Sequence, residues 1–215
     1  MKVDIWSDIM CPFCYIGKRK FEKALEQFQH KDEVEVEWHS FQLQPDAQHV
    51  PGKDTYDFLA EIKGTTREQA KEMNNYVAGM AREVGLQYDF DNLKVANTFD
   101  SHRLIHLAAK HGLQDKAKER LLAAHFLEGQ NVQDQETLVA LGSEIGLEAA
   151  EVREMLSSEN YAYEVKMDIQ QSRNLGINGV PFFVLNNKYG ISGAQPSEVF
   201  LKALEQTWAE ENQAS

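Results

Sequence analysis

The signals for β-strands lie only near the two ends of this 215-residue chain. Residues 2–7 alternate apolar and polar side chains, and the first half of the segment 34–43 does so strictly. This pattern predicts a strand in each segment. Near the other end, strands are expected over 179–185 and 189–192, with a turn at 186–188 between them. One sheet built from both ends requires the long middle of the chain to leave the sheet and return to it.

Helical periodicity fills the remainder of the chain. A helix is expected to begin at Cys11-Pro12 and run to about His30, and a final helix follows Pro196. The order is therefore β-α-β, a long helical stretch, then β-β-α, which predicts an α/β fold. We expect one discontinuous sheet domain, formed by residues 1–50 and 171–215, interrupted by a helical insertion domain over residues 51–170.

Within the helical stretch, local signals mark individual helices. Thr66 and Gln69 have the spacing of a capping box, which predicts a helix start. Another helix is expected over residues 99–111, ended by a glycine. Met73 and Met80 have core spacing and are expected to pack inside.

Composition excludes several classes of function. The chain has 22 basic and 34 acidic residues, a net charge of −12, which argues against nucleic-acid or anionic-membrane partners. It has no apolar run long enough for a membrane span. Asp4 and Asp8 interrupt the apolar character of the N-terminal residues, so no secretion signal is evident and a cytoplasmic location is expected.

The two cysteines, Cys11 and Cys14, form a C-x-x-C pair at the predicted helix start. Free N–H groups and the helix dipole at that position stabilise a thiolate, so we expect a lowered pKa for Cys11. Cys14, one turn further, can attack a mixed disulfide formed on Cys11. Pro12 and Phe13 add apolar surface beside the sulfurs and are expected to contact substrate. The pattern predicts a redox-active dithiol.

Two other interpretations of the cysteines were weighed. A zinc site is disfavoured because the chain has no second cysteine pair and no histidine pair follows the cysteines at finger spacing. His102 and His106 are four residues apart, but they lie inside an amphipathic helical pattern, so no metal is expected. Two buried structural cysteines are a further alternative, disfavoured by the strand–loop–helix context.

Three further positions are candidates for a role at the dithiol. Val180-Pro181 opens a strand that lies beside the cysteine helix in the inferred fold, and a cis bond there would expose the Val180 backbone to a bound peptide or thiol compound. Asp8, three residues before Cys11, could move a proton to or from Cys14, although such residues more often cap a turn. His39 lies in the second strand, where a hydrogen-bonded or exposed histidine is the commoner case.

Three segments together resemble the DsbA-like thioredoxin superfamily, in particular its FrnE type. They are Cys11-Pro12-Phe13-Cys14-Tyr15-Ile16-Gly17, the stretch 97–104 that opens on Asn97-Thr98-Phe99, and Gly179-Val180-Pro181-Phe182-Phe183 followed by 192–196. The resemblance covers essentially the whole chain and implies a thioredoxin-like fold split by an all-helical insertion. It also implies that Cys11 attacks, Cys14 resolves, and Val180-Pro181 is a cis-proline loop facing them. His102 and Arg103, inside the second segment, are candidates for the groove above the thiols.

The same superfamily contains 2-hydroxychromene-2-carboxylate isomerases and kappa-class glutathione transferases. Those proteins usually carry serine where Cys11 stands and lack the second thiol, and they tend to have an acidic residue where Gln195-Pro196 stands here. Both differences disfavour a transferase or isomerase, but glutathione remains a candidate external reductant.

The sequence therefore predicts a cytoplasmic thiol–disulfide oxidoreductase, a reductase or isomerase, that uses Cys11 and Cys14 and holds no bound cofactor. Its expected substrate is a disulfide-containing protein or a small thiol compound, and a monomer or homodimer is expected. Two alternatives remain open: a glutathione-dependent isomerase or transferase acting on an aromatic or polyketide-like molecule, and a redox-regulated binding or chaperone-like module.

Overall fold

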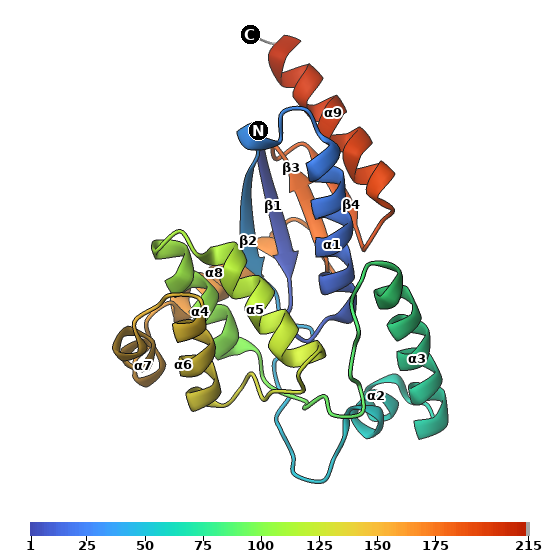
Figure 1. Ribbon diagram of the computed structural model, residues 1–215, viewed down its shortest axis with the longest axis vertical. Helices are drawn as coiled ribbons and strands as arrows, with labels where there is room; N and C mark the ends of the chain where they lie inside the picture. Colours follow the sequence, from blue (N-terminus) through green and yellow to red (C-terminus); the bar gives the residue numbers. More distant parts are fainter. Residues whose placement is uncertain (214–215) are drawn as a thin grey trace.

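The computed structural model describes residues 1–213, and its centre is a four-stranded sheet with the strand order β2-β1-β3-β4 (Figure 1). The strands are β1 (Lys2–Ser7), β2 (Glu35–Ser40), β3 (Phe182–Leu185) and β4 (Tyr189–Ser192). β1 runs parallel to β2, with Ile5 beside Trp38, and antiparallel to β3, with Ile5 beside Phe183. The sheet thus joins the two ends of the chain, as the sequence predicts.

Local sequence explains how the strands end. Asn186 and Asn187 connect β3 to β4, and both have positive φ (47° and 55°). This conformation suits the tight turn of a β-hairpin, and asparagine tolerates it better than most residues. β2 ends at Ser40, three residues earlier than expected, and β3 begins only at Phe182, after the Val180–Pro181 bond.

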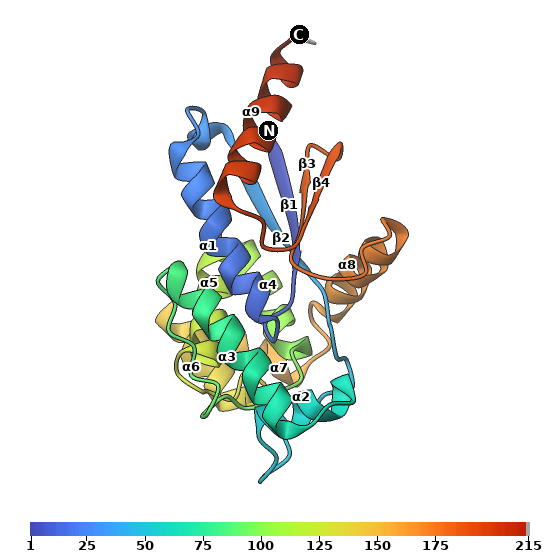
Figure 2. The same ribbon diagram turned by 90° about the vertical axis from the view of Figure 1, so that its right-hand side faces the viewer.

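Two helices cover one face of the sheet, and a third lies on the opposite side (Figure 2). α1 (Pro12–Gln27) and α9 (Ser197–Gln213) pack against each other over the first face. The aromatic rings of Phe21, Phe183 and Phe200 lie 4.6–5.8 Å apart between the helices and the sheet. α8 (Ala162–Asn174) contacts β2 from the other side. The sheet is therefore buried on both faces near the end from which β1 leads to α1.

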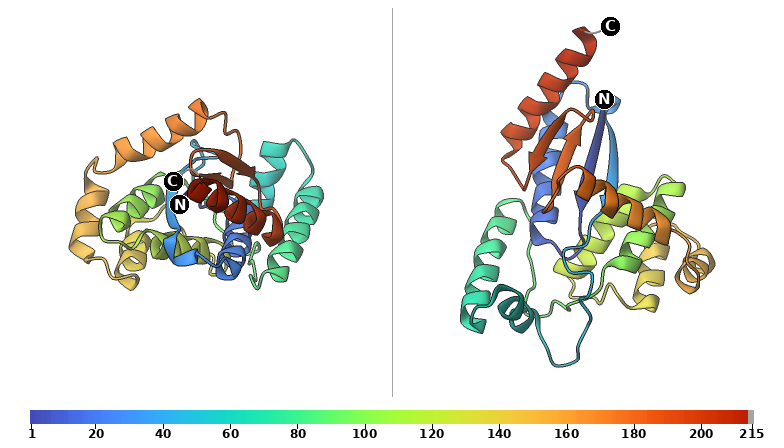
Figure 3. Two further views of the ribbon diagram at one scale, coloured as in Figure 1. Left: turned by 90° about the horizontal axis from the view of Figure 1, so that it is seen from above. Right: turned by 180° about the vertical axis from the view of Figure 1, so that it is seen from behind.

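The helices between β2 and β3 form the insertion. They are α2 (Thr55–Lys63), α3 (Arg67–Glu83), α4 (Phe99–Lys110), α5 (Gln114–Phe126), α6 (Gln135–Glu144), α7 (Ala149–Ser157) and α8. The views in Figures 1 and 3 show α2 and α3 on one side of the start of α1, and α4 to α7 on the other. The expected boundary at residue 170 falls inside α8, which continues to Asn174.

Two details of the insertion test the local predictions. The capping box is present: Thr66 Oγ1 accepts a hydrogen bond from Gln69 N, and Gln69 Oε1 accepts one from Thr66 N. The packing predicted for Met73 is wrong, since Met73 is 41% exposed, whereas Met80 packs against the core. Among the described residues, no helix is long and apolar enough to cross a membrane.

Candidate active site

The two cysteines lie at the N-terminus of α1, directly below the end of β1. Cys11 is the N-cap residue, with an extended backbone, and Pro12 is the first helical residue. The Cys11 N–H donates to Asp8 O at 3.3 Å, and the Cys14 N–H donates to Cys11 O at 3.0 Å. Pro12 fits this position because its missing N–H would have no partner in the first helical turn. The side chain of Cys11 does not cap the helix, which leaves its sulfur available for other contacts.

The two sulfurs have different surroundings. Cys14 is completely buried, whereas Cys11 is 3% exposed and lines a large cavity. Cys11 Sγ lies 3.3 Å from the carbonyl oxygen of Val180, and the Val180–Pro181 peptide bond is cis. Both cysteines carry free thiols. The cavity gives a substrate access to the sulfur of Cys11 and not to that of Cys14.

The pKa values of the two thiols are shifted in opposite directions. The hydrogen bond to Cys14 raises the pKa of Cys11 well above its ordinary value, and burial and the negative charge of Cys14 act in the same direction. Burial also acts to raise the pKa of Cys14, but the hydrogen bond from Cys11 and the charge of Lys118 outweigh it and lower that pKa. The lowered pKa predicted for Cys11 is therefore wrong for the reduced protein, because the Cys11 thiol donates its hydrogen bond to Cys14 and so holds its proton more tightly.

The loop that carries Pro181 packs closely on α1 through a glycine. A side chain on Gly17 would place its Cβ 2.8 Å from Pro181 Cγ, closer than real Cβ contacts allow. The Gly193 N–H donates to Pro181 O at 2.8 Å and fixes the loop from the other side. Glycine at position 17 thus allows the Val180–Pro181 loop to approach the dithiol.

Asp8 forms a buried polar centre behind the dithiol. Its carboxylate accepts hydrogen bonds from the backbone N–H of Leu43 at 2.7 Å and from the hydroxyl of Thr98 at 2.8 Å, and lies 3.3 Å from Nε2 of His102. Burial acts to raise the pKa of Asp8, but the contact with His102 and the other hydrogen bonds outweigh it and lower the pKa. The structure therefore brings two of the predicted residues, Asp8 and His102, together beside the cysteines. The groove position predicted for His102 is wrong, since its side chain is 1% exposed and does not line the cavity beside Cys11.

His39 lies in a second buried cluster, on β2. Its Nδ1 is 2.9 Å from Asp168 Oδ1 and its Nε2 is 2.8 Å from Asp4 Oδ1. Its ring stacks on Trp6 with the centroids 4.4 Å apart. Burial acts to lower the pKa of His39, but the two carboxylates outweigh it and raise the pKa. His39 is thus the hydrogen-bonded strand histidine that the sequence favours.

Arg103 requires a correction, because it neither lines the groove nor lies on a solvated helix face. It is 5% exposed, and its guanidinium donates to the carbonyl oxygens of Asn160, Met155 and Ser158. Arg103 also pairs with Asp100 at 2.7 Å. These bonds satisfy backbone groups around the end of α7, so Arg103 supports the insertion.

His39 also belongs to a group of three side chains that could ligate a metal ion. The group offers three ligand atoms that lie within 4.8 Å of one another, one each from Asp4, Glu37 and His39. The ammonium group of Lys2 is 2.8 Å from Asp4 Oδ1 and 2.5 Å from Glu37 Oε2. One side-chain cation thus already pairs with both of these carboxylates.

The cavity beside Cys11 has a volume of about 760 Å³ and lies between the start of α1 and the helices α2 and α3. Pro12, Phe13 and Val180 line it, as do apolar side chains of the insertion. Those apolar residues are Phe58, Leu59, Ile62, Met73, Tyr76, Val77, Phe90, Leu93, Val95 and Phe126. Of the described residues that line the cavity, only Lys63 and Glu72 carry a charge at neutral pH.

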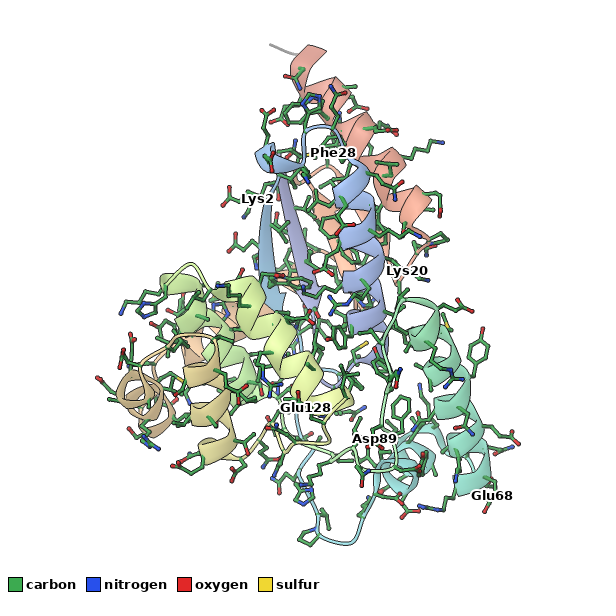
Figure 4. The ribbon with its side chains drawn as sticks, in the orientation of Figure 1. Lys2, Lys20, Phe28, Glu68, Asp89 and Glu128 are labelled. Carbon is green, nitrogen blue, oxygen red and sulfur yellow. The ribbon has the colours of Figure 1, made fainter. Side chains whose placement is uncertain are left out.

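The loop after α3 closes the cavity against the end of α5. Asp89 N donates to Phe126 O at 2.8 Å, and Figure 4 shows Asp89 and Glu128 on neighbouring segments there, whereas Lys2 marks the opposite end of the sheet. Tyr88, on this loop, donates from its hydroxyl to Pro12 O at 2.7 Å. The insertion is thereby tied directly to the first turn of α1.

Sequence reasoning missed two buried residues of α5 that face the site. Lys118 is 1% exposed, and its charge acts on both cysteines. His125 lines the cavity, and burial lowers its pKa to about 4, so the ring is neutral. Lys118, Leu121, Leu122 and His125 follow helical spacing on the buried face of α5. A lysine on that otherwise apolar face is the sequence signal that could have identified Lys118 as a candidate site residue.

Comparison with known proteins agrees with this geometry. Residues 2–205 match the model of the DSBA-like thioredoxin domain, so the chain belongs to that family, a family of DsbA-like oxidoreductases. A probable DsbA oxidoreductase from Streptomyces coelicolor is 42% identical, with a TM-score of 0.91 over 98% of this chain and 91% of that one.

Two further similar proteins have a lower sequence identity. An uncharacterized protein of Bacillus subtilis, YwbO, is 28% identical over 94% of both chains. The cytosolic disulfide reductase DsbM of Pseudomonas aeruginosa shares the fold, with 20% identity and a TM-score of 0.69 over 97% of this chain and 100% of that one.

Proposed function

We propose that the protein is a thiol–disulfide oxidoreductase that reduces or isomerises disulfides with Cys11 and Cys14. The observation that carries the proposal is the difference between the two thiols: Cys11 borders the cavity, and Cys14 lies directly behind it, fully buried. A substrate disulfide can therefore reach one sulfur only, and the other is held ready for an internal attack.

The reaction has two exchange steps. As Cys11 attacks one substrate sulfur, its proton passes along the hydrogen bond to Cys14, the substrate S–S bond breaks, and the leaving sulfur is protonated by solvent. Cys14 then gives up its proton to solvent, and its thiolate attacks Cys11. The Cys11–Cys14 disulfide forms, the Cys11–substrate bond breaks, and the second substrate sulfur leaves as a thiolate that solvent protonates. Two electrons have passed to the substrate. An external thiol must then reduce the protein, and glutathione is our candidate.

Apolar surface at the site supports a particular kind of substrate. Phe13 is 37% exposed beside the reacting sulfur, and most side chains of the cavity wall are apolar, with Lys63 and Glu72 as the charged residues among those described. Such a wall favours disulfides flanked by apolar groups, whether in a protein segment or in a small molecule. A protein that reduces substrate disulfides in this way operates best in a reducing compartment, which agrees with the cytoplasmic location expected from the sequence.

Single-cysteine variants test the proposal. Cys11→Ser should reduce insulin-disulfide reduction to background, since no other thiol can open the substrate bond. Cys14→Ser should accumulate a mixed disulfide on Cys11, which mass spectrometry detects as an adduct. Ser157→Ala, at an exposed position of α7, is the control and should remain active. Unchanged activity in Cys11→Ser would contradict the proposal.

The apolar cavity also favours the second candidate, a glutathione-dependent isomerase acting on an aromatic molecule. That chemistry needs only one thiol, so Cys14→Ser should keep full turnover of such a substrate. The oxidoreductase requires both thiols and should lose catalytic turnover in the same variant. The Cys14→Ser variant therefore separates the two functions.

A further inference from the structure

Lys118 and Lys18 are two equally buried lysines close to Trp38, but only Lys18 forms ion pairs with carboxylates among the described residues. Each is 1% exposed, and their ammonium nitrogens lie 5.5 and 5.9 Å from the Trp38 ring centroid. Lys18 forms ion pairs with three carboxylates, including Asp115 and Glu119 at 3.2 Å each. Lys118 forms no ion pair with any carboxylate among residues 1–213. A buried ammonium without such a partner costs folding free energy, so its retention calls for another explanation.

The charged and titratable groups that face Lys118 come from three parts of the molecule. Cys14, Cys11 and Lys18 belong to α1, Asp8 precedes that helix, and His102 lies on α4. Burial lowers the pKa of Lys118 to about 8, and the negative charge of Cys14 is the largest influence in the opposite direction. The ion pair of Asp115 with Lys18 and the hydrogen bond of Tyr15 to Glu119 hold this part of α5 against the first turns of α1. The ammonium group of Lys118, over the Trp38 ring, therefore faces the buried Cys14.

We propose that Lys118 is the counter-charge that stabilises the Cys14 thiolate when Cys14 attacks the mixed disulfide on Cys11. Lys118 thereby controls the rate of the resolving step. It is a positioning residue, since it acts through Cys14 and touches no substrate. This inference rests on the proposed dithiol function.

The mixed disulfide makes this role specific to the second step. In the reduced protein, the Cys14 thiolate is stabilised first by the hydrogen bond from Cys11 and next by Lys118. Once Cys11 is joined to a substrate sulfur, it has no proton to donate, and that hydrogen bond is lost. Burial still disfavours the Cys14 thiolate, so the charge of Lys118 becomes its main support. Cys14 then forms the new S–S bond, the Cys11–substrate bond breaks, and solvent protonates the departing thiolate.

Stopped-flow reaction of the reduced protein with dithiobis-nitrobenzoate tests the proposal. The first aromatic thiolate reports attack by Cys11, and the second reports attack by Cys14. Lys118→Met should slow the second phase about 3- to 30-fold, because losing an adjacent charge raises a thiol pKa by about 1–3 units and the residual thiolate becomes more nucleophilic. The first phase should change by less than about 2-fold. Lys116→Met removes a charge from the exposed side of the same helix and should leave both phases unchanged.

A titration gives a readout that does not depend on turnover. In a Cys11→Ala background, thiolate absorbance reports the pKa of Cys14 alone, without a hydrogen bond from position 11. Adding Lys118→Met should raise that pKa by about one unit or more, and adding Lys116→Met should not change it. Lys118→Gln provides a second neutral variant, so a folding defect in one does not decide the result.

The two proposals fail in different ways. An unchanged Cys14 pKa and an unchanged second phase in both Lys118 variants would overturn the role of Lys118, while the proposed function would stand if Cys11→Ser remained inactive. Conversely, a shifted Cys14 pKa in a protein whose wild type reduces no disulfide would overturn the function and keep the electrostatic pairing.

Discussion

Two buried polar clusters link the sheet to the helical insertion, and their charges are balanced differently. The His39 cluster consists of Asp4, His39, Ser40, His106 and Asp168. The dithiol cluster consists of Asp8, Cys14, Thr98, His102 and Lys118. Both combine residues of the sheet edge or the start of α1 with residues of the insertion helices, and both lie in the interior.

In the His39 cluster, every charge has a partner of opposite sign. Both ring nitrogens of His39 lie within hydrogen-bond distance of a carboxylate, and this pairing raises the pKa of the ring and favours its charged form. Asp168 also accepts from the Ser40 N–H at 2.7 Å and lies 3.0 Å from Nε2 of His106. Burial acts to raise the pKa of Asp168, but these contacts outweigh it and lower the pKa. Such a cluster fixes β2 against α4 and α8.

In the dithiol cluster, Lys118 lacks a carboxylate partner among the described residues, and its counter-charge is a sulfur whose ionisation changes during the proposed reaction. The comparison teaches that complete pairing maintains structure, whereas incomplete pairing leaves a charge available to a reacting group. The predictions below test this distinction by removing one charge from each cluster.

The largest effect is expected from Asp168→Ala. This change leaves the His39 cation without one of its carboxylates and leaves the Ser40 N–H unpaired in the interior. The free energy of unfolding should fall by about 3–5 kcal/mol, as for other broken buried pairs. Urea denaturation followed by tryptophan fluorescence measures it.

Glu164→Ala, on the exposed side of α8, is the control and should lower the stability by less than about 1 kcal/mol. In the folded fraction of Asp168→Ala, the Cys14 attack should keep its wild-type rate. A slower attack by Cys14 in that fraction would show that the two clusters are coupled, and it would contradict the distinction between a structural and a reacting cluster.

A medium effect, of opposite sign, is expected from Lys118→Met. Replacing an unpaired buried ammonium by an apolar chain of similar length should raise the free energy of unfolding by about 1–3 kcal/mol. Lys18→Met should instead lower it by about 1 kcal/mol, a small loss because its carboxylate partners are partly exposed. Thermal and urea melts of both variants measure the difference. A loss of stability in Lys118→Met as large as in Lys18→Met would mean that Lys118 serves the fold.

The sequence was sufficient for the fold and for the dithiol, because both leave local signals. Alternation marks β1 and β2, the proline after Cys11 marks the start of α1, and the paired asparagines mark the β3–β4 turn. The polar clusters leave no such signal. His39 meets Asp168 across 129 positions of sequence, and each looks ordinary on its own strand or helix.

The same limit explains the errors around the site. Lys118 comes from α5, whose position under Cys14 depends on how the insertion docks on the sheet. Arg103 lies next to His102 in the sequence, but helical geometry turns it toward the end of α7. Neighbours in a helix point in different directions, so a motif alone could not separate the residue near the dithiol from the one that supports the insertion.

The smallest effect, a pH dependence, tests whether His39 is charged in the folded protein. A histidine whose pKa is raised by folding stabilises the native state fully below its unfolded pKa of about 6.5, and this contribution is lost as the pH rises through the folded value. The stability difference between wild type and His39→Gln should therefore decrease, on the order of 1 kcal/mol or more, as the pH rises above about 6.5. Subtracting the variant removes the contributions of groups such as His125 and Lys118, whose pKa values are lowered and whose slopes have the opposite sign. Urea denaturation at a series of pH values gives the difference directly. A difference that stays constant across this range would mean that His39 is neutral when folded, and the His39 cluster would then lack the complete pairing that distinguishes it from the dithiol cluster.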